Sequence, residues 1–407
     1  MLSVASRPYI SASIPVLREY GLAITLRFYR DMFTAQPELM QLFNMGNQAN
    51  GSQQHALASA LFAYAANIDN KDVLAPVIRR IANKHASLGL TPSHYPIVGR
   101  YLLGAIRAVL GEAATPELLA AWDEAYWLLA DELITTEAHL YQNKGVPLSM
   151  PFSRVRVARR EVQSDNAVAL TLAAVDGKPL RDFQPGQYIS VEVPLDHHCR
   201  QLRQYSLSAE RGLATWRITI KREEGSLQVP AGAVSNWLHA NACEGTELAV
   251  SAPFGDFTPE LQSRHPLVLL SAGIGITPML SILRTLAIEH STRPVLFAYA
   301  TRSGRHHVHR TDVQWASARM PQLHTHISYA LPEPVDHVGR DYDHAGTMPI
   351  AALLNKQSTQ HFKDGAFYLC GPIGFMQAQR HALISAGVGV ERIHREVFGP
   401  DLLDNLL

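Results

Sequence analysis

The spacing of apolar residues changes twice along this chain, so a single layered domain cannot contain all of it. As far as about residue 141, apolar side chains recur every three or four positions, which is typical of amphipathic helices. The first segment is therefore expected to be all-α. The apolar faces that we expect to be shared are Leu22, Leu26, Tyr29 and Phe33, and Val77, Ile81, His85 and Leu88.

The remaining chain contains two different strand patterns, one after the other. Short runs rich in Val, Ile and Thr, such as 168–172, are separated by turns such as Asp176-Gly177, which predicts an antiparallel β-barrel. Further along, fully apolar runs at 267–270 and 295–299 alternate with helical stretches. Runs of that kind predict an α/β domain with a parallel sheet and crossover helices.

Proline and glycine mark the expected element boundaries. Helices are expected to start at Thr91-Pro92 and Thr115-Pro116, where a capping hydroxyl precedes a proline suited to the first turn. The run 144–151 contains a glycine and two prolines, which cannot continue a helix. With 407 residues the chain is long enough for two or three cores, and we expect domains at 1–147, 152–260 and 264–407.

The charge balance excludes several classes of partner. Lys plus Arg and Asp plus Glu are both 36, so no basic field is present to attract nucleic acid or an anionic membrane. The N-terminal residues lack a signal-peptide pattern, and apolar runs are too short to span a bilayer. The odd number of cysteines, Cys199, Cys243 and Cys370, fits reduced thiols. We expect a cytoplasmic protein without disulfides or structural zinc.

The run 267–279 has the order strand, glycine turn and helix start. Gly273 and Gly275 allow the backbone to approach a pyrophosphate, Ile276 opens the helix, Thr277 is expected to cap it, and Pro278 suits its first turn. The third glycine of the usual dinucleotide motif is missing, so a plain strand-to-helix turn explains this run equally well by itself.

Four further motifs accompany this run. Arg203-Gln204-Tyr205-Ser206 offers a cation for a phosphate, a ring for a flavin face and a hydroxyl for a flavin nitrogen. A small-residue helix start follows at 232–238, then Tyr368-Leu369-Cys370-Gly371-Pro372 and Glu396-Val397-Phe398-Gly399-Pro400. In this order the motifs resemble the ferredoxin reductase type of module, which binds FAD and NADH or NADPH, from residue 152 onward.

This resemblance implies roles for individual residues. Phe398 would cover the flavin ring where nicotinamide enters. Glu396, beside Val397 and Gly399, would tune the electrostatics of the flavin ring. The residues implied to hold FAD are Tyr188, Arg203, Gln204, Tyr205, Ser206, Gly232, Val234 and Ser235. Those implied to line the nicotinamide cofactor's site are Gly273, Gly275, Ile276, Thr277, Pro278, Cys370, Gly371 and Pro372. Taken alone, Cys370 is equally a small buried residue after a strand.

The choice between NADH and NADPH stays open. No acidic residue follows the strand 296–299, and Arg302 and Arg305 are basic there. Either arginine could pair with a 2′-phosphate, although solvated loop charges explain them as well.

The helical segment resembles the globin domain of flavohaemoglobins, so the resemblance covers essentially the whole chain. It is carried by residues that occur in order and nearly without gaps: Tyr29, Phe43-Asn44-Met45, Gln53, Leu57, Lys84-His85-Ala86-Ser87, Tyr95 and Thr136-Glu137-Ala138. Singly, each is explained as a core or surface residue. Jointly they are not.

The globin resemblance implies a haem b site. His85 would be the proximal iron ligand, and Tyr95 with Glu137 would lie behind it, where a carboxylate raises the basicity of the imidazole. On the opposite side Tyr29, helped by Gln53, would donate a hydrogen bond to the bound ligand. Leu57 would crowd the iron, Phe43 would pack on the porphyrin, and Lys84 would lie near the haem edge.

The implied activity is that of a nitric oxide dioxygenase. Electrons would pass from NAD(P)H through FAD to haem iron, where O2 and NO, the two small-molecule substrates, are converted to nitrate. Two alternatives are an oxygen or NO sensor that keeps its own iron reduced, and a general NAD(P)H-dependent reductase whose haem pocket also holds lipid. We expect a monomer.

Two histidine-rich stretches receive no role. His306-His307-Val308-His309 lacks carboxylate or cysteine partners in the sequence and is expected to be a solvated helix start. His197-His198-Cys199 is expected to be a barrel loop.

Overall fold

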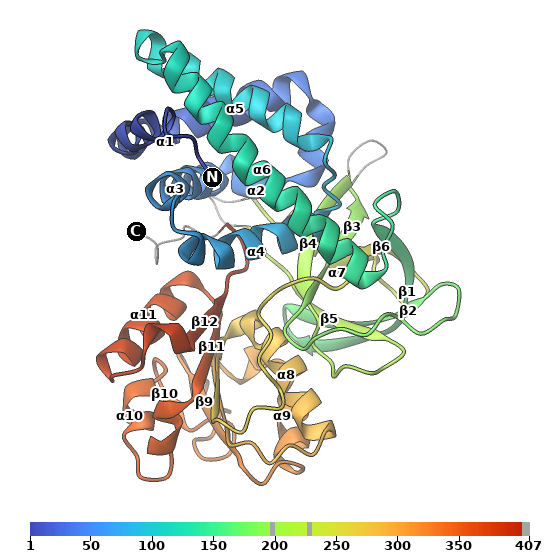
Figure 1. The fold of residues 1–407 in the computed structure, drawn as a ribbon. Coiled ribbons are helices and arrows are strands. Elements are labelled where there is room, and N and C mark those ends of the chain that lie inside the picture. The colour runs from blue at the N-terminus through green and yellow to red at the C-terminus, as the bar shows by residue number, and fades with distance from the viewer. Residues whose placement is uncertain (196–199, 226–229, 401–407) are drawn as a thin grey trace.

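The computed structural model describes residues 1–195, 200–225 and 230–400 of the chain, and the stretch 197–199 discussed above lies outside them. Helices form the first part, an antiparallel sheet the second and a parallel sheet the third, as the sequence patterns predict. Figure 1 shows the helical part above the two sheets, with helix α4 along the side that faces them. No helix within the described ranges is both long and apolar enough to cross a bilayer.

The helical part is built around a long first helix that packs against α3 and α5. Its α-helices are α1 (Arg7–Ala35), α2 (Met45–Ala49), α3 (Ser52–Asn67), α4 (Lys71–Leu88), α5 (His94–Leu110) and α6 (Pro116–Lys144), and its 3₁₀ helices are η1 (Pro37–Leu42) and η2 (Gly111–Ala113). The core contains Ile10, Ile24, Phe28 and Met32 from α1.

One predicted face of α1 is partly wrong. Tyr29 and Phe33 are buried, but Leu22 and Leu26 are 36% and 48% exposed. The buried face follows Leu17, Ile24 and Phe28 instead, because the helical period of 3.6 residues places Leu22 and Leu26 beside this stripe rather than on it. In the same helix, polar Ser13 and Thr25 are buried by bonding to backbone carbonyls.

Of the two caps predicted in the helical part, one is confirmed. Thr115 accepts a hydrogen bond from the Leu118 amide at 3.2 Å, and α6 begins at Pro116. Thr91 is no cap, because α5 begins only at His94. Its hydroxyl group contacts the side chains of Ser93 and His94 at 2.8 and 3.0 Å, so it is not available to the helix amides.

The antiparallel sheet has six strands in the order β4-β3-β6-β1-β2-β5. It curls so that its edges meet at a bridge between Leu207, just after β4, and Ile218 in β5. Leu170, Ile189 and Ile218 are fully buried inside it. Its elements are β1 (Phe152–Ser164), β2 (Ala167–Ala174), β3 (Tyr188–Pro194), β4 (Arg200–Ser206), β5 (Trp216–Lys221), α7 (Ala233–Asn241) and β6 (Glu247–Ser251).

The parallel sheet has the strand order β10-β9-β8-β7-β11-β12. The chain runs outward from β7 to β10 and returns to the other side of β7 with β11, so the topology switches between β7 and β11. Its strands are β7 (Leu267–Ala272), β8 (Val295–Thr301), β9 (Leu323–Tyr329), β10 (His344–Ala345), β11 (Ala366–Cys370) and β12 (Ile393–Glu396). Its helices are η3 (Gly273–Gly275), α8 (Ile276–Ile288), η4 (Gly304–His306), α9 (Arg310–Ser317), α10 (Ile350–Leu354), η5 (Gln360–Asp364), α11 (Ile373–Ser385) and η6 (Val390–Arg392).

A buried network of charged side chains joins the two sheets. Arg217 of β5 lies 3.1 Å from Asp312 of α9, and Arg284 of α8 pairs with both Asp312 and Glu210. His309 bridges the same boundary, with its ring nitrogens 2.8 Å from the Thr219 hydroxyl and 2.7 Å from Asp312. Buried charges need such partners, so the two sheets are held in a fixed relative position.

The expectation of a solvated 306–309 stretch is therefore wrong for two of its histidines. His307 is 8% and His309 1% exposed, and His307 Nδ1 lies 2.8 Å from the Tyr329 hydroxyl. The expectation failed because these two rings have polar partners in the folded protein, Tyr329 for His307 and Asp312 for His309. Within the described ranges no group of three or more His, Cys, Asp or Glu side chains could hold a metal ion.

Candidate active site

His85 lies in the last turn of α4, where its ring meets two other helices. Nδ1 is 2.8 Å from Glu137 Oε1 on α6 and 3.2 Å from the Tyr95 hydroxyl on α5. The Tyr95 hydroxyl donates to the same carboxylate oxygen at 2.5 Å, and the Tyr126 hydroxyl donates to the Tyr95 carbonyl. Three helices thus fix one imidazole in position.

The partners of Nδ1 favour one tautomer of the ring, in which Nδ1 is the donor. Glu137 is 3% exposed and accepts from both neighbours. Burial, and then the charge of Glu137, raise the pKa of Tyr95, so its hydroxyl stays protonated as a donor. When Nδ1 donates its proton to this carboxylate, Nε2 carries the lone pair through which an imidazole binds metals.

A second cluster surrounds Tyr29. Its ring contacts Phe43 edge-on with centroids 5.7 Å apart, and Gln53 Nε2 lies 3.5 Å from its hydroxyl oxygen. Tyr29 is 5% exposed, and burial raises its pKa to about 12. Gln53 lies in the first turn of α3, and Leu57 lies one turn later. The hydroxyl is a protonated donor in apolar surroundings.

The residues around His85 fit a haem. Val77, Ile81 and Leu88 share the half-buried face of α4 on which His85 lies, as the sequence predicts, and Phe43 and Leu57 pack against the same core. His85 is also only partly buried, with 27% of its side chain exposed. One imidazole nitrogen beside apolar side chains is the donor set that a haem iron with a single protein ligand requires.

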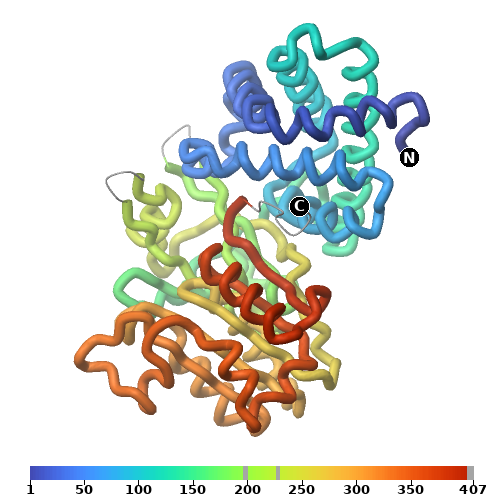
Figure 2. Tube along the Cα trace, turned by 90° about the vertical axis from the view of Figure 1, so that its left-hand side faces the viewer, coloured from blue at the N-terminus to red at the C-terminus, as the bar shows by residue number. Residues whose placement is uncertain are grey.

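Lys84, next to His85, contacts the end of the parallel-sheet part. Its Nζ lies 3.2 Å from the Gly399 carbonyl. Gly399 follows β12, whose last residue Glu396 lies opposite Cys370 in the sheet register. Figure 2 shows this last described segment rising from the sheets toward the helices. The sequence did not predict this contact between the first and third parts of the chain.

The predicted flavin residues gather on β3, β4 and α7. Tyr188 lies directly opposite Ser206 in the register of the two strands. Burial raises the pKa of both Tyr188 and Tyr205, so each hydroxyl stays protonated. The Ser235 hydroxyl accepts from the Glu223 amide at 3.1 Å and donates to the Gly232 carbonyl at 3.0 Å.

Two of the predicted flavin residues, both partly exposed, contact the helical part. Arg203 donates to Asn44 Oδ1 at 2.8 Å and to the Leu202 carbonyl at 2.7 Å. Gln204 donates to the Ser87 hydroxyl at 3.2 Å. The motif 203–206 therefore lies at the boundary with α2 and α4, and burial lowers the pKa of Arg203 there.

The predicted nucleotide motifs meet at the topological switch of the parallel sheet. A Cβ on Gly275 would come within 2.4 Å of the Cys370 carbonyl oxygen and 2.7 Å of the Gly371 amide nitrogen. Only glycine allows this approach, which joins the ends of β7 and β11. Cys370 is fully buried, and burial raises its pKa, so it is a neutral thiol.

One detail predicted for this motif is wrong. Thr277 does not cap α8, because the helix begins at Ile276 with Gly275 as the preceding residue. The Thr277 hydroxyl points back to the Ile274 carbonyl at 3.0 Å. Pro278 does lie in the first turn, as predicted.

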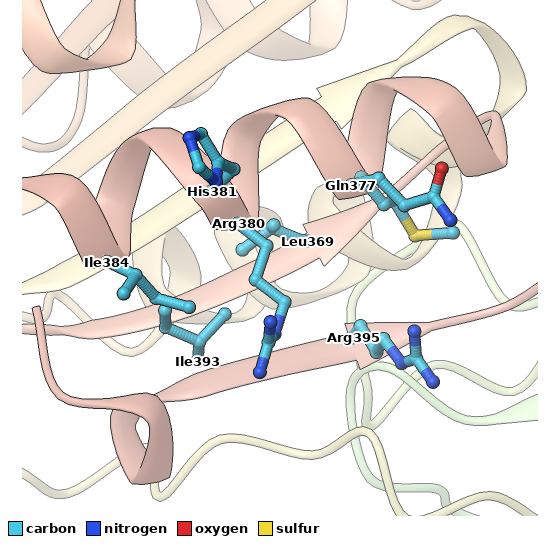
Figure 3. Close-up of a pocket in the computed structure, with 8 residues that line it drawn as sticks. Leu369, Gln377, Arg380, His381, Ile384, Ile393 and Arg395 are labelled. Carbon is cyan, nitrogen blue, oxygen red and sulfur yellow. The ribbon is translucent and has the colours of Figure 1, made fainter. Parts of the chain in front are cut away.

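A separate hollow of about 180 Å³ lies between α11 and β12 (Figure 3). Its polar lining comes from Gln377, Arg380, His381 and Arg395, and Ile384 and Ile393 form part of the apolar lining. None of its lining residues belongs to the predicted site.

Sequence reasoning missed the side chains that join α4 to the antiparallel sheet. Asn83 Oδ1 accepts from the Gly255 amide at 2.8 Å, and Ser87 receives a hydrogen bond from the Ser190 hydroxyl at 3.0 Å. Asn83 and Ser87 lie two residues on either side of His85. Their only signal in the sequence is a short polar side chain inside a helix, and such residues are common.

Two family models match parts of the chain. The globin model matches residues 26–133, and the model for the oxidoreductase NAD-binding domain matches residues 269–381. A flavohaemoprotein of Rhizobium meliloti (strain 1021) is 42% identical over 405 residues, with 99% of both chains covered. A flavohaemoprotein of Chromobacterium violaceum is 44% identical over 405 residues, with 98% of each chain covered.

Solved structures agree in fold. A flavohaemoglobin from Malassezia yamatoensis, with bound FAD and haem, matches with a TM-score of 0.86 and 31% identity over 98% of this chain and all of that one. The FAD/NAD-binding domain of a nitric oxide dioxygenase from Vibrio cholerae matches with a TM-score of 0.53 and 37% identity. It covers 61% of this chain and 99% of that one.

Proposed function

Because this chain belongs to the flavohaemoprotein family, we propose that it is an NAD(P)H-dependent nitric oxide dioxygenase containing haem b and FAD. The family relationship, a solved relative with FAD and haem, and a solved nitric oxide dioxygenase module support this proposal. The observation that carries it is the His85–Glu137–Tyr95 group in the same chain as a nucleotide-type α/β domain.

The overall reaction balances for a hydride donor. NAD(P)H with two NO and two O2 gives NAD(P)⁺, a proton and two nitrate ions. Haem, when bound, supplies a one-electron centre for diatomic gases, and FAD divides the two electrons of a hydride between successive turnovers. The protein's own residues must bind these groups, orient the substrates and hold the required protons.

His85 is proposed to hold the haem iron through Nε2. Its hydrogen bond from Nδ1 to Glu137 increases the electron density on the ring, and Tyr95 holds the carboxylate in place. An imidazole with that character favours redox chemistry over simple storage. Glu137 and Tyr95 act through His85, so they are positioning residues.

Tyr29 is proposed to orient the gas substrates. Its hydroxyl stays protonated and is buried, and among the residues that the structure describes its hydrogen-bonding partner is Gln53, at a long 3.5 Å. A donor of this kind stabilises a ligand atom that gains negative charge, since it needs no reorganisation in a site without water. Leu57 and Phe43 are proposed to exclude water and to pack against the porphyrin.

The FAD and nicotinamide sites are proposed on the motifs described above. Tyr188, Gln204, Tyr205 and Ser206 would contact the flavin, and Arg203, Gly232, Val234 and Ser235 would hold the rest of FAD. The nicotinamide cofactor would lie along Gly273 to Pro278 and Cys370 to Pro372. Glu396, Val397, Phe398 and Gly399 would form the passage between the two, and Lys84 would adjust the haem potential.

The position of α4 supports electron transfer between the first two domains. The helix that carries His85 is hydrogen-bonded to β4 through Ser87 and Gln204, the neighbour of the proposed flavin residue Tyr205. Polar contacts on both sides of His85 fix its distance from that motif. A fixed distance between redox groups is what a multi-step electron path needs.

Stopped-flow mixing tests the function directly. The holoprotein, reduced by NADH in air-saturated buffer, is mixed with NO while nitrate, NO and NADH are followed. Repeated turnover at two NO consumed per NADH supports the proposal. A single turnover indicates the sensor, and NADH oxidation that NO does not accelerate indicates the general reductase.

Four further properties are proposed together with this function: the domain boundaries, the cellular location, the oligomeric state and lipid binding. The domain boundaries are placed at 1–147, 152–260 and 264–407, since the linking segments 145–151 and 252–266 contain no α-helix and no strand. The protein is proposed to act as a cytoplasmic monomer, and its apolar haem pocket is proposed to accept a lipid chain. Sedimentation, cell fractionation and mass spectrometry of extracted lipid test these points.

A further inference from the structure

The sheet that carries the nucleotide motifs has two paired loops beside them. β8 ends at Thr301 and its neighbour β9 ends at Tyr329, and the pairing continues into both loops. The Ala330 amide donates to the Thr301 carbonyl at 2.9 Å, and the Leu331 amide donates to the Arg302 carbonyl at 2.8 Å. The loop after β9 is thereby held over the end of β8.

A carboxylate from the second loop is anchored at the end of the first. Ser303, 1% exposed, donates its hydroxyl proton to Glu333 Oε1 at 2.9 Å. Glu333 itself is partly exposed, and within the described ranges its Oε2 forms no hydrogen bond. One oxygen is therefore fixed and the other is available to a ligand.

A second carboxylate makes this arrangement rigid. Asp336 Oδ2 accepts from the Gly304 amide at 3.2 Å and from the Glu333 amide at 2.8 Å. A Cβ on Gly304 would lie 2.2 Å from Asp336 Oδ1, so the two loops approach as closely as glycine permits. Glu333 is consequently held by its backbone as well as by its side chain.

The basic residues of the first loop are not bound in the same way. Arg305 pairs with Asp165 of the antiparallel sheet at 2.9 Å, with both side chains more than half exposed. Arg302 is exposed and forms no ion pair with any residue that the structure describes. Exposed and loosely held charges contribute little binding energy. These two arginines are therefore weaker candidates for contacting the nucleotide than the anchored Glu333 carboxylate.

The geometry points to Glu333 as the residue that selects NADH over NADPH, an inference that rests on the proposed nicotinamide site. In α/β dinucleotide domains, an acidic side chain at the end of the strand after the glycine turn accepts the ribose 2′-hydroxyl group of NADH. Here β8 has no acidic residue of its own, and Glu333 from the next loop occupies that end. A 2′-phosphate would meet its negative charge.

Binding of nucleotide fragments tests the inference without haem turnover. The holoprotein is titrated calorimetrically with 5′-AMP and with 2′,5′-ADP, which differ only in the 2′-phosphate. The parent protein should bind 5′-AMP more tightly. E333Q should bind 2′,5′-ADP on the order of tenfold more tightly than the parent, since a charge repulsion of about 1.4 kcal/mol is removed.

Glu391→Gln is the matched control. It removes the same charge from the same domain, but Glu391 lies before β12, at the opposite edge of the sheet, and is 78% exposed. It should leave both affinities unchanged. A further comparison is the rate of flavin reduction by NADPH, which should rise in E333Q and not in E391Q.

Three results would overturn the inference: tighter binding of 2′,5′-ADP by the parent protein, no change in E333Q, or selectivity that follows Arg302→Ala instead. The outcome is independent of NO chemistry. Absence of nitrate formation would contradict the dioxygenase and leave the fragment selectivity intact, whereas failure of both fragments to bind would contradict the nicotinamide site.

Discussion

The hydroxyl groups of Ser87 and Ser190 lie 3.0 Å apart across the boundary between the globin and the antiparallel sheet, and both side chains are fully buried. Ser87 also donates to the Lys84 carbonyl at 2.8 Å, within the turn that carries His85. One serine therefore connects the proposed haem ligand's helix to the second domain.

Ser87→Ala should destabilise the protein, because the buried Ser190 hydroxyl and the Gln204 amide both lose an acceptor. The cost of such unsatisfied groups is about 1–3 kcal/mol. Urea unfolding measures it, with the exposed Ser149→Ala as a control that should change nothing. The double variant S87A/S190A should lose less than the sum of the two single variants, and full additivity would show that the contact contributes no coupling.

His85→Ala should remove haem-dependent turnover and leave flavin reduction intact. The imidazole is the proposed iron ligand, whereas the nucleotide motifs belong to another domain, at the topological switch between β7 and β11. Visible spectra of the variant under anaerobic NADH should show flavin bleaching without the spectral change of haem reduction. Full NO consumption by this variant would refute the ligand assignment.

Tyr29→Phe should lower the rate of NO consumption by about a hundredfold, the usual cost of losing one well-placed donor. The ring and its contacts with Phe43 remain, so stability should change little. Tyr64→Phe is the matched control, since Tyr64 is also buried but donates to the Ala125 carbonyl. Equal effects of the two substitutions would exclude a specific role of Tyr29.

Gly275→Ala should impair nicotinamide binding as well as folding. Its Cβ would lie 2.4 Å from the Cys370 carbonyl, where backbone cannot easily give way. The KM for NADH should rise and the urea midpoint should fall. Gly374→Ala is the control, since its Cβ meets no atom within 4 Å and alanine in a helix is favourable by up to about 1 kcal/mol.

Acid should destabilise the parallel-sheet domain through His307. Burial, and then the charge of Arg310, lower its pKa to about 4, from 6.5. Between these values the unfolded chain holds a proton that the folded protein does not, so stability falls as pH drops from 6.5 toward 4, by about 3 kcal/mol in total. The pH dependence of Tm should be shallower in His307→Gln. It should not vanish, because burial also lowers the pKa of His309.

The sequence predicted the fold well, because hydrophobic period distinguishes helices, barrel strands and parallel strands. It predicted individual faces less well where a long helix has apolar residues on two stripes, as Leu22 and Leu26 show. Caps failed where a hydroxyl found a nearer partner, as with Thr91 and Thr277. These are choices between local hydrogen bonds, and a sequence pattern does not rank them.

Residues that act across domain boundaries were the least predictable. His309 and Asp312 are three positions apart, but burial between the two sheets depends on Thr219, which lies in another domain. Glu333 is an ordinary loop residue until β9 places it beside Ser303. In both cases the partner lies far away in the sequence. The sequence alone therefore predicted a solvated stretch at His309 and no role for Glu333.

The contact between Lys84 and Gly399 links residues that are 315 positions apart. It brings the third domain into contact with the first, so two domains that are not consecutive along the polypeptide are neighbours in space. Removing residues from Gly399 onward, or fixing a bulky label there, would disturb the turn that bears His85. Labels for spectroscopy or immobilisation are better attached at an exposed residue of β1 outside the proposed sites, such as Val162, than at this end of the chain.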